Sequence, residues 1–194
     1  MTIDPEHTAL IVIDAQRAFL EWETAGMRRN NPQALDNIAR LLAAFRKRGM
    51  AIFHIRHASR EPGSALRVDR SGHAPIDEAK EWGGEPVLVK HVNSAFIGTD
   101  LEGRLLKGGF RTLVIAGITT NHCVETTTRM AGNLGFDARL VEDACYTFDR
   151  TGFDGRREAA EDIHRMTLSN LNGEFATIET TDAVLGALAS ARAA

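Results

Sequence analysis

Three side chains that could act together on an acyl group stand beside apolar stretches of the chain: Asp14, Lys90 and Cys123. They offer a carboxylate base, a cation and a thiol nucleophile, which is the set that attack on an acyl carbon needs. A carboxylate beside the thiol can accept its proton and pass it to a leaving amine, while an ammonium holds the carboxylate ionised or steadies the thiolate. These residue types therefore predict nucleophilic acyl chemistry if the fold brings them together.

Cys123 has both a structural and a catalytic interpretation. A single cysteine is often a small buried core residue, but this one follows threonine, asparagine and histidine residues that are too polar for simple core packing. The stretch 112–116 has the length and β-branched content of a buried parallel strand, which Gly117 ends. A helix with Thr119 or Thr120 as its N-cap should follow, which places Cys123 in its first turn. There the unpaired N–H groups and the helix dipole favour a thiolate.

Asp14 and Lys90 each end an apolar run, at 8–13 and 87–89. Asp14 has an alternative role as the N-cap of a following turn, although the residues after it indicate a loop more than a helix. For Lys90 the alternative is an ordinary solvated surface lysine. Because ligands of open α/β sheets bind outside the carboxyl ends of the strands, we expect both residues to lie at that edge with Cys123.

The order of the expected elements indicates how these residues are positioned. Apolar runs of strand length lie at 8–13, 51–55, 87–89, 112–116, 136–141 and 175–178. Helical spacing with start and stop signals predicts helices over 32–48, 101–106, 120–134, 155–170 and from 182 onward. Strands that alternate with helices predict a three-layer α/β/α fold, with a parallel sheet between two layers of helices. Because there is no internal repeat or linker, residues 1–194 are expected to form a single domain.

Composition argues against several classes of function. Of the 194 residues, 43% are hydrophobic and 25% are charged, as in ordinary soluble globular proteins. A net charge of −3 gives no reason to expect nucleic-acid or membrane binding, and no apolar run approaches the roughly 18 residues of a membrane span. The two cysteines, Cys123 and Cys145, have no CxxC or zinc-like spacing, which favours a reducing, cytoplasmic location over a disulfide framework.

A polar segment rich in proline and glycine, from about 59 to 86, separates two of the expected strands. Segments of this length without regular structure are uncommon in compact domains and are usually lids or binding loops. Trp82 within it either packs over a site or anchors the loop to the body of the protein. We expect part of the substrate specificity to reside in this loop.

Four motifs, in their order and spacing, make the chain resemble the isochorismatase-like cysteine hydrolases from about residue 8 to 146. The motifs are Asp14-Ala15-Gln16-Arg17-Ala18-Phe19, then Lys90 followed by Ser94-Ala95-Phe96, then Gly117-Ile118-Thr119-Thr120-Asn121-His122-Cys123-Val124, and finally Glu142-Asp143-Ala144-Cys145. The resemblance implies a Rossmann-like isochorismatase fold, whose six-stranded parallel sheet has the order 3-2-1-4-5-6. It also implies a homo-oligomer, either a dimer or a tetramer.

The same resemblance implies roles for individual residues. Asp14, Lys90 and Cys123 would form the catalytic triad. A cis peptide bond between Ile118 and Thr119 would turn the backbone N–H groups of Thr119 and Cys123 into an oxyanion hole.

The chain also departs from the family pattern. Ala18 and Asn121 stand where many relatives have aspartates, so neither position is expected to act as an acid. Nicotinamidases of this family bind a metal through an acid and histidines near the end of the second strand. Here His54 and His57 have no acid beside them, so neither a metal nor another cofactor is expected. Isochorismatase itself lacks the cysteine, so Cys123 indicates amide hydrolysis and not vinyl-ether hydrolysis.

Together these observations predict a hydrolase that cleaves the C–N bond of a small amide, ureide or lactam through a thioester on Cys123. Two alternatives stay open: a hydrolase of a non-amide substrate, as isochorismatase is, and a non-catalytic small-molecule-binding protein on the same scaffold. A nucleotide-binding oxidoreductase is disfavoured because no GxGxxG motif follows the first strand. The residues expected to line the substrate site are Gln16, Phe19, Trp22, Phe96 and Asn121. Residues that could receive a substrate carboxylate, or equally be solvated, are Arg56, His57 and Arg67.

Overall fold

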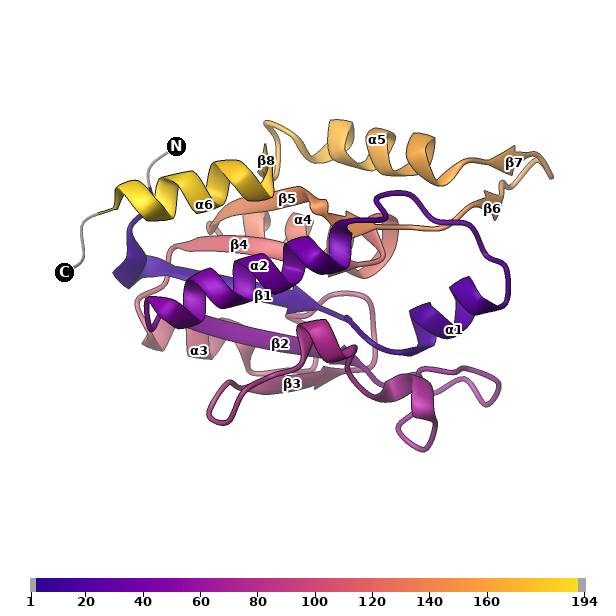
Figure 1. The fold of residues 1–194 in the computed structure, drawn as a ribbon, viewed down its shortest axis with the longest axis horizontal. Helices are drawn as coiled ribbons and strands as arrows, with labels where there is room; N and C mark the ends of the chain where they lie inside the picture. Colours follow the sequence, from indigo (N-terminus) through magenta and orange to yellow (C-terminus); the bar gives the residue numbers. More distant parts are fainter. Residues whose placement is uncertain (1–2, 192–194) are drawn as a thin grey trace.

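The computed structural model describes residues 3–191, which fold around a six-stranded sheet of order β3-β2-β1-β4-β5-β8 with every pair parallel (Figure 1). The strands are β1 (Thr8–Ile13), β2 (Ala51–His57), β3 (Val87–Lys90), β4 (Thr112–Ile118), β5 (Asp137–Tyr146) and β8 (Thr177–Glu179). Since β8 is the sixth strand of this sheet, the predicted order 3-2-1-4-5-6 is confirmed.

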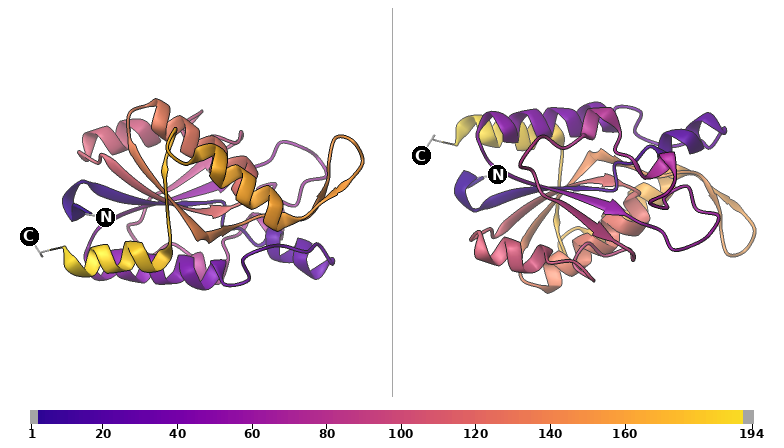
Figure 2. Two further views of the ribbon diagram at one scale, coloured as in Figure 1. Left: turned by 90° about the horizontal axis from the view of Figure 1, so that it is seen from above. Right: turned by 90° about the horizontal axis from the view of Figure 1, so that it is seen from below.

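Helices cover both faces of the sheet, as the alternation of strands and helices predicted. The helices are α1 (Ala18–Thr24), α2 (Ala34–Lys47), α3 (Leu101–Lys107), α4 (Glu125–Asn133), α5 (Ala160–Leu171) and α6 (Thr181–Ser190). In Figure 2, α2 and α6 lie on one face, and α3, α4 and α5 lie on the other. Among residues 3–191, no helix has the length and apolar character needed to cross a membrane.

Apolar side chains on both faces of the central strand β1 explain why it reads as a continuous hydrophobic run. Its residues are at most 2% exposed. Leu10 and Val12 pack into the core beneath α2 and α6, whereas Ile11 and Ile13 pack into the core beneath α3, α4 and α5. Successive side chains of a strand point to opposite faces, so a strand covered on both sides needs apolar residues throughout.

Several predicted boundaries were wrong. A loop was expected after Asp14, but α1 forms there, without a side-chain cap that sequence could reveal. The fifth strand was expected to end at residue 141 and continues to Tyr146. The segment before α5 was assigned to a helix from residue 155, but it contains an antiparallel hairpin of β6 (Arg150–Thr151) and β7 (Arg157–Glu158). Both strands of this hairpin are exposed, so they show no hydrophobic alternation.

The 59–86 segment contains two short 3-10 turns, η2 (Ser71–His73) and η3 (Asp77–Ala79), and its end is held against α2 and β2. Arg46 forms a bidentate ion pair with Glu85 at 2.7 and 2.8 Å, and the Glu85 carboxylate also accepts the Trp82 backbone N–H. Although burial opposes ionisation, these hydrogen bonds lower the pKa of Glu85 to about 2. The Arg46 guanidinium stacks 4.3 Å from the centre of the Trp82 ring. Trp82 therefore anchors this segment to the body of the protein and does not pack over the site.

Candidate active site

Asp14, Lys90 and Cys123 meet at the carboxyl ends of the central strands. The Lys90 Nζ donates to Asp14 Oδ2 at 2.7 Å and to Cys123 Sγ at 3.1 Å. Asp14 and Lys90 are 1% and 0% exposed, so Lys90 is not the solvated surface lysine that was its alternative. Little water screens this ion pair, and removal of either partner would leave a buried charge without a counter-ion.

The backbone at the ends of β1 and β4 sets this geometry. Ile13 of β1 pairs with Gly117 of β4, and a Cβ added to Gly117 would lie 2.1 Å from the Ile13 carbonyl oxygen. Only glycine allows the two strands to approach this closely. Directly after Ile13, Asp14 takes a left-handed backbone conformation with φ of 49°, which aspartate tolerates better than most residues. Its N–H donates to the Ile55 carbonyl at 2.9 Å, which fixes the turn against β2.

Cys123 lies in a π-helical turn, Thr120–Val124, directly before α4. Thr119 is the N-cap residue of this turn, as predicted, but its side chain makes no capping hydrogen bond. Instead, the Thr120 hydroxyl lies 2.8 Å from His164 Nδ1 on α5, which supports the turn from behind. The peptide bond between Ile118 and Thr119 is cis, as the family resemblance implied.

The expectation that the helix end favours a thiolate on Cys123 was wrong. Burial and the neighbouring Asp14 carboxylate raise the pKa of the Cys123 thiol to about 12, because Lys90 lowers it too little to compensate. A helix terminus contributes only about half an elementary charge, which is small beside the loss of hydration. The sulfur is therefore a thiol near neutral pH, and it needs a base to become a nucleophile.

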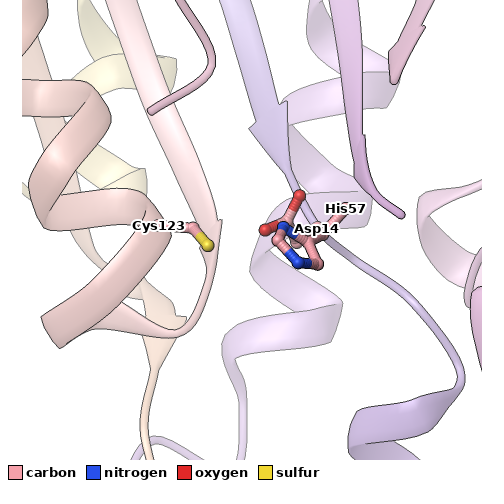
Figure 3. Close-up of side chains that lie close together, drawn as sticks. All are labelled: Asp14, His57 and Cys123. Carbon is pink, nitrogen blue, oxygen red and sulfur yellow. The ribbon is translucent and has the colours of Figure 1, made fainter. Parts of the chain in front are cut away.

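His57, at the end of β2, is a fourth member of this cluster and was missed as such by the sequence analysis. Figure 3 shows Asp14 and His57 facing Cys123, and one carboxylate oxygen, one ring nitrogen and the sulfur of these residues lie within 4.8 Å of one another. Lys90 Nζ lies 3.2 Å from His57 Nδ1, and β2 and β3 pair in register at these two residues. Burial and the Lys90 charge lower the pKa of His57, so the ring is neutral and its Nδ1 accepts a hydrogen bond from the Lys90 ammonium.

This cluster has the composition of a metal site but does not fit one. An ammonium group has three N–H donors, and those of Lys90 have Asp14, His57 and Cys123 as their three partners. A metal ion bound by those same atoms would have to displace the ammonium and face its positive charge. His54 offers no alternative, because it points to the other face of β2 and pairs with Glu85 at 2.9 Å.

A cavity of about 480 Å³ opens in front of the cysteine. We call Asp14, His57, Lys90 and Cys123 the reactive end of the site, and Trp22, Met27, Asp149 and Arg150 its recognition rim. The other residues that line the cavity are Phe19, Leu66, Asn93, Thr119, Asn121, His122, Thr147 and Phe148. Its apolar wall is aromatic: Phe19 stacks on Phe148 with ring centroids 6.3 Å apart, and Trp22 meets both rings edge-on.

Three of the five residues expected to line the substrate site do line the cavity, and two do not. Phe19, Trp22 and Asn121 line the cavity, and Asn121 is held by the Thr147 hydroxyl, which donates to its Oδ1 at 2.5 Å. Gln16 does not line it, because its side chain is buried and its Oε1 accepts the His57 N–H at 2.8 Å.

Phe96 was also expected in the site and is instead stacked on Phe136 in the core beneath α4, with ring centroids 6.0 Å apart. Two of the residues considered for a substrate carboxylate have other partners, since Arg56 pairs with Glu81 and Arg67 pairs with Asp69.

Comparison with known proteins finds relatives of this chain in both sequence and structure. A family model described as the isochorismatase domain matches residues 8–183. The isochorismatase family protein YrdC of Bacillus subtilis, which is uncharacterised, is 41% identical over 93% of this chain and 95% of its own length. Ureidoacrylate amidohydrolase RutB of Variovorax paradoxus is 27% identical over 100% of this chain and 86% of its own length.

Two solved structures extend the comparison. An isochorismatase-family protein from Chromobacterium violaceum superimposes with a TM-score of 0.93 at 43% identity, over 98% of both chains. A cysteine hydrolase from Pseudomonas syringae superimposes with a TM-score of 0.90 at 25% identity, over 99% of this chain and 97% of the other.

Proposed function

The chain belongs to the isochorismatase family of hydrolases, and on that premise we propose that it cleaves the C–N bond of a small amide, ureide or lactam through a thioester on Cys123. The observation that carries this proposal is the placement of Asp14. Its Oδ2 accepts from Lys90, whereas its Oδ1 is buried and has no hydrogen-bond partner among the described residues. That oxygen is free to receive the thiol proton at the moment of attack.

In the first step the Cys123 sulfur bonds to the substrate carbonyl carbon while its proton passes to Asp14. The carbonyl π electrons move to oxygen, and backbone N–H groups of Thr119 and Cys123 stabilise that oxyanion, as the resemblance implies. Asp14 then returns the proton to the leaving nitrogen, the C–N bond breaks, and a thioester remains. The Lys90 ammonium contacts both Asp14 and Cys123, so it stabilises the negative charge on whichever of the two carries it.

Hydrolysis of the thioester repeats the same steps with water. Asp14 takes a proton from water as the oxygen attacks the thioester carbon, and the carbon–sulfur bond breaks. The thiolate then recovers its proton from Asp14. Over the whole cycle Asp14 takes one proton from the thiol and one from water, and it gives one to the leaving nitrogen and one to the thiolate, so the reactive end returns to its starting charge.

Two relatives support the C–N bond and the cysteine as the reacting groups. Ureidoacrylate amidohydrolase is named for C–N cleavage, and the Pseudomonas syringae structure is named a cysteine hydrolase. A hydrolase of a non-amide substrate and a non-catalytic binding protein remain the competing functions.

The test is a screen of small amides, ureides and lactams for ammonia or amine release, combined with mass spectrometry of the protein after rapid acid quench. We expect turnover of at least one class and an acyl adduct on the peptide that contains Cys123. Prior treatment with a metal chelator should leave the rate unchanged, because Lys90 already provides the central cation. Release from no compound, with no adduct, would favour the binding protein, and activity lost to chelation but restored by zinc or iron would refute the metal-free mechanism.

A further inference from the structure

Arg150 occupies an unusual position for an arginine of this protein. It is the one arginine or lysine among the described residues that line the cavity, and it begins the hairpin strand β6 beyond the carboxyl ends of the sheet. Most arginines of the chain are in ion pairs with acids, but within residues 3–191 no carboxylate pairs with Arg150. Its one side-chain hydrogen bond joins Nη1 to His122 Nε2 at 3.2 Å.

The acid next to it in sequence is already neutralised by other groups. Asp149 accepts from Arg28 at 3.1 Å, from Arg157 at 2.6 Å and from the Ala160 N–H at 2.8 Å. These three donors use both carboxylate oxygens. Asp149 therefore lines the cavity beside Arg150 without balancing its charge.

The histidine that holds Arg150 is neutral. Burial and the nearby Arg150 charge both lower the pKa of His122. Its Nε2 then accepts the arginine N–H, and its Nδ1–H donates to the Thr119 hydroxyl at 3.1 Å. This chain of hydrogen bonds orients the guanidinium from the Thr119 turn while leaving its positive charge and most of its five donors unused.

We propose that Arg150 binds a carboxylate of the substrate, so that this hydrolase acts on small amides or ureides that carry a carboxylate beyond an apolar body. A planar guanidinium binds a carboxylate through two parallel hydrogen bonds. The aromatic wall of Phe19, Trp22 and Phe148 suits the apolar body, and Cys123 receives the C–N group. This inference specifies the substrate of the proposed C–N hydrolase and rests on that function.

The experiment compares compounds that have the same shape and differ in charge. Each monoamide of a dicarboxylic acid is paired with its neutral diamide: succinamate with succinamide, glutaramate with glutaramide, and 3-carbamoylbenzoate with isophthalamide. The specificity constant kcat/KM for ammonia release is measured for the wild type, Arg150→Gln, Arg150→Lys and the control Arg156→Gln. Arg156 lies in the same hairpin, but its side chain is 83% exposed and does not line the cavity.

We expect the wild type to prefer the charged member of at least one pair by about tenfold or more, as a charge-assisted bidentate contact would give. Arg150→Gln should lose most of that preference through KM, Arg150→Lys should keep part of it, and Arg156→Gln should keep it all. Equal use of acid and diamide by the wild type, or an unchanged preference in Arg150→Gln, would overturn the inference while leaving C–N hydrolysis intact.

A binding measurement separates this inference from the proposed function. Calorimetric titration of the Cys123→Ser protein with isophthalate, glutarate and their diamides needs no turnover. Tighter binding of the dicarboxylates that Arg150→Gln abolishes would support the anion site even if no amide is hydrolysed. Failure of every dicarboxylate to bind more tightly than its diamide would overturn it.

Discussion

At the reactive end of the cavity, Asp14 and Lys90 are buried and bound to each other, whereas on the recognition rim Met27 is 42% exposed and Arg150 is exposed on a two-residue strand. The reactive end is built on the ends of β1, β2 and β3 and on the turn after β4. The rim is built on α1 and the β6–β7 hairpin, which extend beyond the sheet (Figure 1). Chemistry is thus placed on the buried ends of the sheet strands, and recognition is placed on exposed elements beyond them.

The largest effect should come from the reactive end. Cys123→Ser keeps the shape of the side chain, so we expect kcat to fall by at least about a thousandfold with little loss of folded protein. Asp14→Asn should lower kcat as far, but it should also lower the stability of the fold, because it leaves the buried Lys90 charge without its partner. Cys145→Ala is the matched control, because Cys145 is fully buried and touches no part of the cavity. Turnover of Cys123→Ser close to that of the wild type would remove the nucleophile from the mechanism.

Acid should lower the free energy of unfolding through His164, which packs behind the turn that carries Cys123. Burial lowers the pKa of His164 to about 4, whereas it would be about 6.5 in the unfolded chain. Between these values the unfolded state binds the extra proton, so stability is full above pH 6.5 and is lost as the pH falls toward 4. The loss should be about 3 kcal/mol.

Urea denaturation at a series of pH values measures this loss. The variant His164→Asn retains a polar atom that can reach the Thr120 hydroxyl. Its free energy of unfolding should change much less than that of the wild type between pH 6.5 and pH 4. If the variant shows the same acid dependence as the wild type, another group is responsible.

The two cysteines should react at different rates although burial raises the pKa of both to about 12. Cys123 borders the cavity, whereas Cys145 is 0% exposed and reacts only when the structure opens. We expect iodoacetamide to label Cys123 at least about fiftyfold faster. The Cys123 rate should rise up to pH 10 without a plateau, because the thiolate fraction still increases there.

Peptide mapping during a timed reaction measures both rates, and activity should fall in step with the Cys123 adduct. Faster labelling of Cys145, or full labelling of Cys123 with activity retained, would contradict the assignment of the nucleophile.

The smallest effect should come from the rim. Removal of an aromatic wall in Trp22→Ala should raise KM by about tenfold and change kcat less, because the wall contacts substrate and not the reacting atoms. Trp82→Ala is the control, since that ring stacks on Arg46 outside the cavity. Equal effects of the two substitutions would show that the Trp22 result reflects general loss of packing.

The sequence predicted the reactive end better than the recognition rim. The strand order and the placement of Asp14, Lys90 and Cys123 were accessible because buried parallel strands read as apolar runs, and the residues that end such runs meet at one edge. The pKa of Cys123 could not be predicted from the sequence, because it depends on burial by residues that are distant in the chain.

The recognition rim was harder to predict from the sequence, for a different reason. Arg150 lies on a short exposed hairpin with no hydrophobic pattern, so nothing in the sequence separated it from other surface arginines. Gln16 and Phe96 were misplaced because their positions near the motifs do not reveal the direction in which the side chains point.

Lys90 gives the site a counter-ion that is part of the polypeptide. A cation that arrives by diffusion has an affinity, an exchange rate and competitors, and an enzyme that depends on it follows the supply of that ion. Here the charge is acquired when β3 pairs with β2 at the edge of the sheet, and it stays for the lifetime of the folded chain. The capacity of this site for chemistry should therefore follow the folded fraction of the protein and not the ionic composition of its surroundings.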